Sequence, residues 1–78
     1  MINAMDWVLD IRDKNPDLKG VALNVVDCDG VEELRVEDVD GNVLALTTED
    51  DNEEGWDQLI QKLIKRFQAL NIHVEVRS

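Results

Sequence analysis

Apolar and polar residues follow two different periods along this 78-residue chain, and together they predict six elements. Residues 5–12 and 56–70 carry apolar side chains at steps of three and four, which is the spacing of a helix with one buried face. Four shorter segments, 21–26, 32–37, 43–48 and 72–76, are predicted as strands, the first, second and last from their period of two. The predicted order is helix, three strands, helix, strand.

Capping residues mark the ends of the two predicted helices. Asn3 is the expected N-cap of the first helix, because its side-chain oxygen can accept from the free backbone N–H groups of the first turn. Pro16 disfavours helical geometry at the residue before it, so this helix is expected to end near residues 13–14. Asp51 or Asn52 is the expected cap of the second helix.

Two Asp-Gly sequences, Asp29-Gly30 and Asp40-Gly41, separate the first three strands. Asp-Gly between strand-like segments is a strong hairpin signal, because glycine adopts positive φ without strain. The chain is therefore predicted to be a single acidic α+β domain spanning residues 1–78, with two helices on one face of a mainly antiparallel sheet. The last strand is expected beside the first or the third strand.

The periodicity also predicts which side chains form the core and which face solvent. On the second strand, Glu33, Arg35 and Glu37 are expected to share the solvent face. The expected core residues are Val8, Leu23, Val25, Leu34, Val36, Leu46, Leu59, Ile60, Leu63, Ile64, Phe67 and Val74.

Acidic residues are concentrated in the middle of the chain. Eighteen Asp and Glu against eight Lys and Arg give a net charge of −10. The window 27–57 holds thirteen acidic residues and one basic residue, Arg35, a net charge of −12; the remaining residues hold five acids and seven bases, a balance of +2. Such a field repels nucleic acid and anionic membranes and attracts basic protein surfaces.

Composition also bears on location. The chain has no apolar run long enough to cross a membrane and no basic stretch followed by an apolar segment at its start, so neither a spanning helix nor a signal peptide is expected. Cys28 is the only cysteine, which excludes an internal disulfide and favours a reducing compartment. The sequence therefore predicts a cytoplasmic protein.

The inventory of catalytic groups is small. The chain has one thiol, Cys28, one imidazole, His73, and one serine, Ser78, and it has no tyrosine. A pair of Cys28 and His73 is conceivable, since a nucleophilic thiolate needs a nearby base. A turn cysteine and an exposed strand histidine are the favoured interpretation, so no enzymatic activity is expected.

Two segments are similar to calcium-binding loops, those beginning at Asp27 and at Asp38. An EF-hand loop has glycine at position six and glutamate at position twelve. Counted from Asp38, position six is Val43, and counted from Asp27, glycine falls at position four. Hairpin turns account for both segments, and no metal or cofactor is expected.

The order of an N-terminal helix, a three-stranded meander with Asp40-Gly41-Asn42, an acidic stretch and a helix resembles small phage anti-CRISPR proteins. In particular, it is similar to the type II-A inhibitors that occupy the PAM-reading cleft of the effector nuclease as DNA mimics. The resemblance covers residues 3–67 and implies that Asp40 and Asp17 face a basic cleft. The chain departs from the family at Val43, where the family has an acid, and at its final strand, where the family has an acidic helix.

The sequence thus predicts a non-enzymatic acidic binding protein, a phage-type inhibitor that occupies the basic nucleic-acid-binding surface of a protein partner and contacts neither nucleic acid nor membrane itself. The alternative is a small interaction, assembly or immunity-type adaptor domain that pairs through a sheet edge, including as a homodimer. The expected partner-binding residues are Asp17, Asp27, Asp29, Glu33, Glu37, Asp38, Asp40, Glu49, Asp50 and Asp51.

Overall fold

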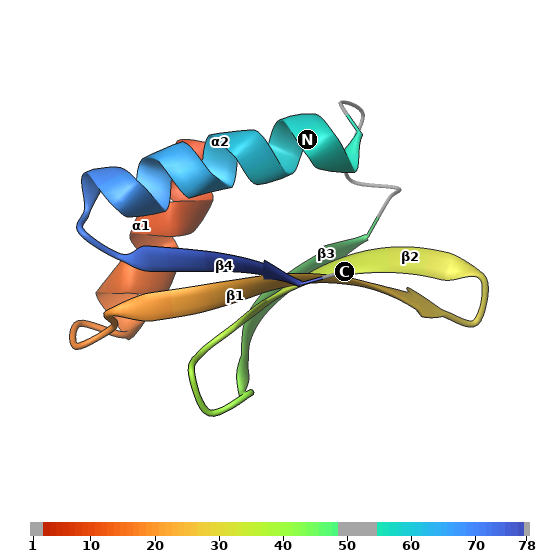
Figure 1. Cartoon of the computed structure of the whole chain (residues 1–78), viewed down its shortest axis with the longest axis horizontal. Helices are drawn as coiled ribbons and strands as arrows, with labels where there is room; N and C mark the ends of the chain where they lie inside the picture. Colours follow the sequence, from red (N-terminus) through yellow and green to blue (C-terminus); the bar gives the residue numbers. More distant parts are fainter. Residues whose placement is uncertain (1–2, 49–54, 78) are drawn as a thin grey trace.

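The computed structural model describes residues 3–48 and 55–77, and within them the elements follow the predicted αβββαβ order. The elements are α1 (Ala4–Lys14), β1 (Gly20–Cys28), β2 (Val31–Glu37), β3 (Val43–Thr48), α2 (Trp56–Ala69) and β4 (His73–Arg77). Both helices lie on the same face of the sheet, as predicted, and leave the other face open (Figure 1).

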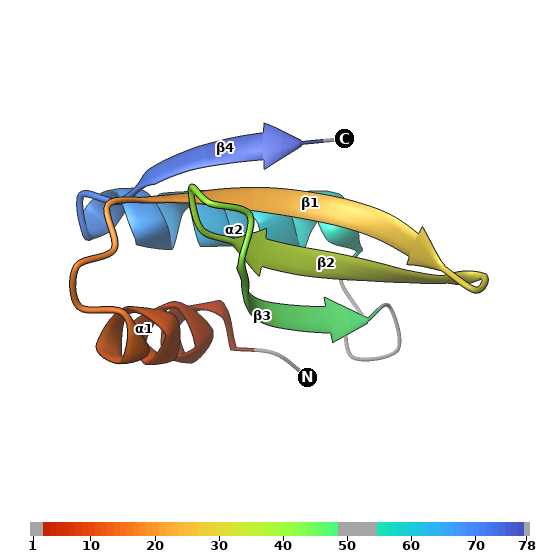
Figure 2. The same ribbon diagram turned by 90° about the horizontal axis from the view of Figure 1, so that it is seen from below.

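The four strands form one sheet in the order β3-β2-β1-β4. β1 pairs antiparallel with β2, and β2 pairs antiparallel with β3, whereas β4 lies parallel to β1. The mainly antiparallel sheet is therefore confirmed, and of the two positions considered for the last strand, β4 takes the one beside β1. Figure 2 shows the consequence of this order: β3 and β4 are the two edge strands, on opposite sides of the central pair.

Helix α1 begins and ends where the sequence predicts. The Asn3 side chain accepts hydrogen bonds from the backbone N–H groups of Met5 (3.1 Å) and Asp6 (3.3 Å), and the helix ends at Lys14. Its buried residues are Ala4, Val8 and Ile11, whereas Met5 and Leu9 are exposed. The buried stripe therefore follows positions 4, 8 and 11, and the apolar neighbours Met5 and Leu9 lie to one side of it.

Helix α2 begins later than the sequence predicts. Its N-cap is Gly55, with φ of 92° and no side-chain cap, and its first helical residue is Trp56. The prediction of a cap at Asp51 or Asn52 is therefore wrong, and both of these residues lie outside the described part of the chain. The helix still carries Asp57 in its first turn and Arg66 in its last, as the helix dipole favours.

The core lies between the two helices and the sheet. Leu23, Leu34, Val36, Leu63 and Phe67 are all fully buried there. The predicted core residues Val25, Ile60, Ile64 and Val74 are partly buried and pack against this cluster, and the sequence-based list omitted the buried residues Ile11, Val21 and Ile72.

Leu46 contradicts the predicted core, because it is 53% exposed. The pairing of β2 with β3 is irregular between Val36 and Glu37: Val36 lies opposite Ala45, whereas Glu37 lies opposite Val43. Leu46 lies opposite Arg35, and side chains of directly paired residues point to the same face of a sheet. Leu46 therefore lies on the open face, away from the helices.

Candidate functional site

The sequence predicts a row of free carboxylates on the open face of β2, and the structure shows that this row is paired with arginines. The Glu33 carboxylate lies 2.8 Å from Arg35 Nε and its side chain is only 15% exposed. This hydrogen bond is the main reason that the pKa of Arg35 is raised above its ordinary value. Glu33 therefore forms an ion pair with its neighbour, so its carboxylate is not free, and its role as a contact residue stays a prediction.

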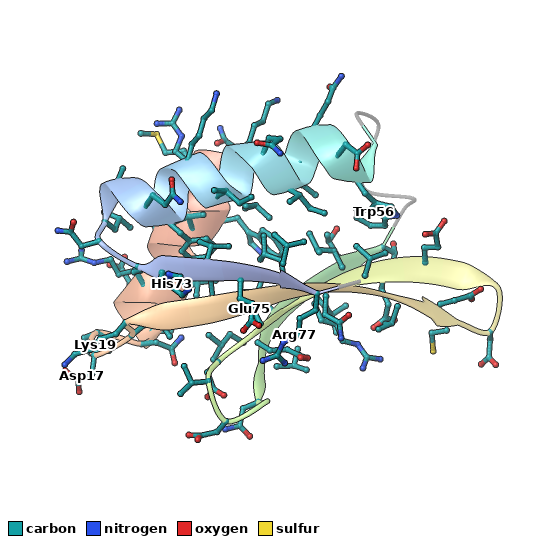
Figure 3. The ribbon with its side chains drawn as sticks, in the orientation of Figure 1. Asp17, Lys19, Trp56, His73, Glu75 and Arg77 are labelled. Carbon is teal, nitrogen blue, oxygen red and sulfur yellow. The ribbon has the colours of Figure 1, made fainter. Side chains whose placement is uncertain are left out.

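Glu37 is also covered. It is only 9% exposed, so the expected solvent-facing carboxylate is buried instead. Arg77 of β4 lies 3.9 Å from it, Nη1 to Oε1, although β1 separates the two strands. Figure 3 places Arg77 and Glu75 on the face of the sheet away from the helices, where Glu37 also lies. The expected exposure of Glu37 to solvent is therefore wrong, and its role in partner binding stays a prediction.

Acidic side chains are instead concentrated at the hairpin between β1 and β2. The strands pair as far as Cys28 and Val31, further than the sequence predicts, and only Asp29 and Gly30 form the turn. Both have positive φ, 53° and 84°, as a two-residue hairpin of the type I′ kind requires. The Gly30 N–H donates to Asp27 Oδ1 at 2.9 Å, which fixes the turn. The hairpin projects beyond the helices (Figure 1).

This hairpin places two carboxylates directly opposite each other. Asp27 on β1 pairs in register with Glu32 on β2, and both side chains are exposed. Residues 26–34 include no Lys or Arg, so no base lies within the hairpin itself. Like charges in directly opposite positions destabilise a strand pair, because their Cβ atoms are only about 4.5–5.5 Å apart.

Glu32 was missing from the sequence-based set of contact residues. A two-residue turn at Asp29-Gly30 sets the register, so that residue 27 must face residue 32. The signal was therefore present in the sequence, and it depended on placing the turn at two residues rather than four.

The loop between β2 and β3 uses one of its two acids to hold its own shape. Asp38 Oδ1 accepts from the backbone N–H groups of Asp40 and Asn42, each at 2.9 Å, and Asp38 Oδ2 accepts from Asn42 Nδ2 at 3.1 Å. These bonds, chiefly those from Asn42, lower the pKa of the Asp38 carboxyl. Asp38 is thus a loop-ordering residue, while the side chain of Asp40 is exposed.

Asp17 lies near this loop. Together with Lys14 and Asp38 it lines a shallow surface depression between the end of α1 and the start of the β2–β3 loop. Figure 3 shows Asp17 at the end of the molecule opposite the β1–β2 hairpin, with Lys19 beside it. Acids and bases are therefore mixed at this end.

The predicted contact residues thus fall into separate groups. Asp27 and Asp29 lie at the hairpin tip, Asp38 and Asp40 lie in the β2–β3 loop with Asp17 near it, and Glu33 and Glu37 are paired on the open face. The remaining three lie outside the described residues: Glu49, Asp50 and Asp51.

The structure also separates the two candidate catalytic groups. Cys28 is the last residue of β1, and His73 pairs with Gly20, the first residue of that strand. Eight residue steps along a strand span roughly 26 Å, so the two side chains do not form a nucleophile–base pair. Within residues 3–48 and 55–77, no three His, Cys, Asp or Glu side chains are grouped as a metal ion requires.

Comparison of the chain with protein-family models, with curated proteins and with solved structures found no match. The resemblance to anti-CRISPR proteins therefore stays a prediction from the sequence pattern. In the described part of the chain, neither helix has the length and apolar character needed to cross a membrane.

Proposed function

We propose that this chain is a non-enzymatic acidic binding protein that occupies the basic nucleic-acid-binding surface of a protein partner, as anti-CRISPR proteins and other DNA mimics of phage do. The observation that carries the proposal is the opposition of Asp27 and Glu32 at the tip of a projecting hairpin. This arrangement lowers the stability of the isolated domain, and a basic surface would turn the repulsion into attraction.

The hairpin is suited to such a contact by its geometry as well as its charge. Asp27, Asp29 and Glu32 are exposed on a short two-stranded arm whose turn is held by the Gly30–Asp27 hydrogen bond. Fixed, closely spaced carboxylates resemble the phosphates of a nucleic-acid backbone, and a cleft that binds phosphates carries the Lys and Arg side chains to pair with them. The acids at the hairpin tip therefore make the primary contact.

Asp40 adds a second contact region in the β2–β3 loop, at the end of β2 away from the hairpin, and Asp17 lies near the start of this loop. Both were expected to face the basic cleft from the resemblance alone. Glu33 and Glu37 on the open face are not assigned to the primary contact, because both are already paired with arginines.

The test measures capture of nucleic-acid-binding proteins and its sensitivity to a single charge. The DNA-binding fraction of a bacterial lysate is passed over the immobilised chain, and retained proteins are identified by mass spectrometry. Retention is expected to fall steeply between 50 and 300 mM salt and on addition of duplex DNA, since it depends on charge. Glu32→Lys is expected to abolish retention.

Asp13→Lys is the matched control, because it makes the same change in net charge at an exposed position on α1. It is expected to retain most of the captured protein. Retention that ignores salt, duplex DNA and Glu32→Lys alike would overturn the proposal.

A second candidate function, an assembly domain that pairs through a sheet edge, is favoured by one observation. The edge strand β3 contains no charged residue and exposes Val43 and Leu46. Sedimentation at increasing protein concentration distinguishes the two functions: a dimer that persists at high salt supports assembly, and a monomer throughout supports the binding protein.

A further inference from the structure

The two edge strands of the sheet differ sharply in charge. β4 has the sequence HVEVR, in which Glu75 and Arg77 are charged and exposed, and charged side chains are a common way of protecting an edge from unwanted pairing. β3 has the sequence VLALTT and no charged residue, in a chain of which 33% is charged. β3 therefore lacks the protection that β4 has.

β3 is also accessible. Among the described residues it pairs with β2 alone, so its outer edge presents backbone groups with no partner in the sheet. Val43 is 46% exposed and Leu46 is 53% exposed on the open face. An edge with free N–H and C=O groups and exposed apolar side chains is a template for the addition of another strand.

The charges that flank β3 determine which kind of added strand can pair with its free edge. Asp38 and Asp40 precede the strand, and the sequence that follows it directly, residues 49–54, contains five acidic residues. Pairing of two copies through β3 would bring two such acidic chains into contact. Two chains of net charge −10 would then meet through like charges, which opposes a homodimer.

We propose that β3 binds an extended segment of a basic protein as a fifth strand of the sheet. The segment pairs with the outer backbone groups of β3, places an apolar side chain against Leu46, and carries Lys or Arg residues at its ends, one of which lies near Asp38 and Asp40. This inference rests on the proposed function, since that function supplies the basic partner.

The probe is a fluorescein-labelled peptide with the sequence RKVTVTVKR, which combines strand-forming residues with basic ends. Its counterpart EDVTVTVDE keeps the strand-forming centre and reverses the ends. We expect the basic peptide to bind the full chain at least tenfold more tightly than the acidic one by fluorescence anisotropy. Amide hydrogen exchange is expected to slow at least tenfold at residues 43–48 and to stay unchanged at residues 73–77.

Two matched variants separate binding at the edge from general attraction of a basic peptide to an acidic protein. Leu46→Lys on β3 and Val76→Lys on β4 each add one positive charge at an apolar residue that is about half exposed, 53% and 50% respectively. Leu46→Lys is expected to lower the affinity for the basic peptide at least tenfold, and Val76→Lys is expected to lower it less than twofold. Leu46→Thr, which adds no charge beside Arg35, is expected to lower the affinity for the peptide by a smaller factor. Circular dichroism checks that all three variants fold.

Two results would overturn the inference. One is slower amide exchange at residues 73–77 instead of 43–48, and the other is an equal loss of peptide affinity in Leu46→Lys and Val76→Lys. Measuring how well the same variants retain proteins of the DNA-binding fraction distinguishes failure of this inference from failure of the proposed function. Loss of retention in Glu32→Lys with full retention in Leu46→Lys overturns the role of the edge and leaves the acidic contact standing. Full retention in Glu32→Lys overturns the acidic contact itself.

Discussion

Arg77 on β4 reaches across β1 to Glu37 on β2, with 3.9 Å between Nη1 and Oε1. Between them on the same face lies Ala22, whose small side chain leaves room for the longer ones and is itself 3% exposed. This contact links three strands on a face that no helix covers. It also explains why a glutamate that faces away from the core is nevertheless buried.

The first prediction concerns the stability of this contact. Glu37→Lys is expected to lower the free energy of unfolding by about 1–2 kcal/mol, because it places a second cation beside Arg77 at a position with little access to water. Asp40→Lys is the control: it makes the same charge change at an exposed loop position and is expected to stay within about 0.5 kcal/mol of the parent. Urea unfolding monitored by tryptophan fluorescence measures both.

Equal unfolding midpoints for Glu37→Lys and Asp40→Lys would show that Glu37 is free in solution. Arg77→Gln is the complementary variant, since it removes the cation and leaves the carboxylate in place. It is expected to destabilise the domain in the same direction and by less than Glu37→Lys.

The second prediction separates stability from binding at the hairpin. Glu32→Lys is expected to raise the stability of the domain by about 0.2–1 kcal/mol, because it replaces a carboxylate opposite Asp27 by a cation. The same variant is expected to retain no partner protein in the capture assay. Thermal unfolding and the capture assay measure the two effects on one sample.

A double-mutant cycle tests whether the gain in stability comes from the opposed pair. Asp27→Lys alone also creates an opposite-charge pair, although it removes the acceptor for the Gly30 N–H. The double variant Asp27→Lys with Glu32→Lys restores a like-charge pair and is expected to lose the gain. Additive effects of the two substitutions would show that the two side chains do not interact.

The sequence predicts the element order and most of the core because these depend on local periods and turn residues. Leu59, Leu63 and Phe67 recur at helical spacing and are buried, and Leu23, Leu34 and Val36 alternate along two strands and are buried. The helical assignments follow from a repeat of three to four residues and the strand assignments from a repeat of two. Both repeats can be read directly from the sequence.

The positions that the sequence placed wrongly depend on contacts between strands. The irregular pairing beside Glu37 sets the face of Leu46, and nothing in the six residues of β3 indicates it. The burial of Glu37 depends on Arg77, forty residues later, and on the choice of β1 as the neighbour of β4. Registers and strand order of this kind are tertiary properties, so a pattern along one strand does not contain them.

The third prediction concerns Thr47, which is 4% exposed and whose Oγ1 has no hydrogen-bond partner among the described residues. A buried hydroxyl without a partner costs free energy, since it gives up its hydrogen bonds to water on folding. Thr47→Val keeps the branched shape and is expected to stabilise the domain by about 1 kcal/mol. Thr48→Val, at the neighbouring half-buried position, is the control and is expected to change stability by less than half as much.

The last prediction concerns acid. Three hydrogen bonds to the ionised Asp38 carboxylate, those from Asn42 first, hold its pKa in the folded protein below the ordinary value of 3.8. A carboxyl with a lowered folded pKa adds stability above its unfolded pKa, and this contribution is lost as the pH falls through the folded value. The loop is therefore expected to lose order as the pH falls below about 3.8, and not between pH 5 and 8. Titration of the side-chain carboxyl carbon by NMR measures the pKa directly.

Asp38→Asn is expected to remove this part of the acid sensitivity, whereas Asp40→Asn, in the same loop, leaves the three bonds in place and is expected to retain it. An Asp38 pKa at or above the ordinary value would contradict the loop-ordering role, because the three bonds would then not favour the charged form.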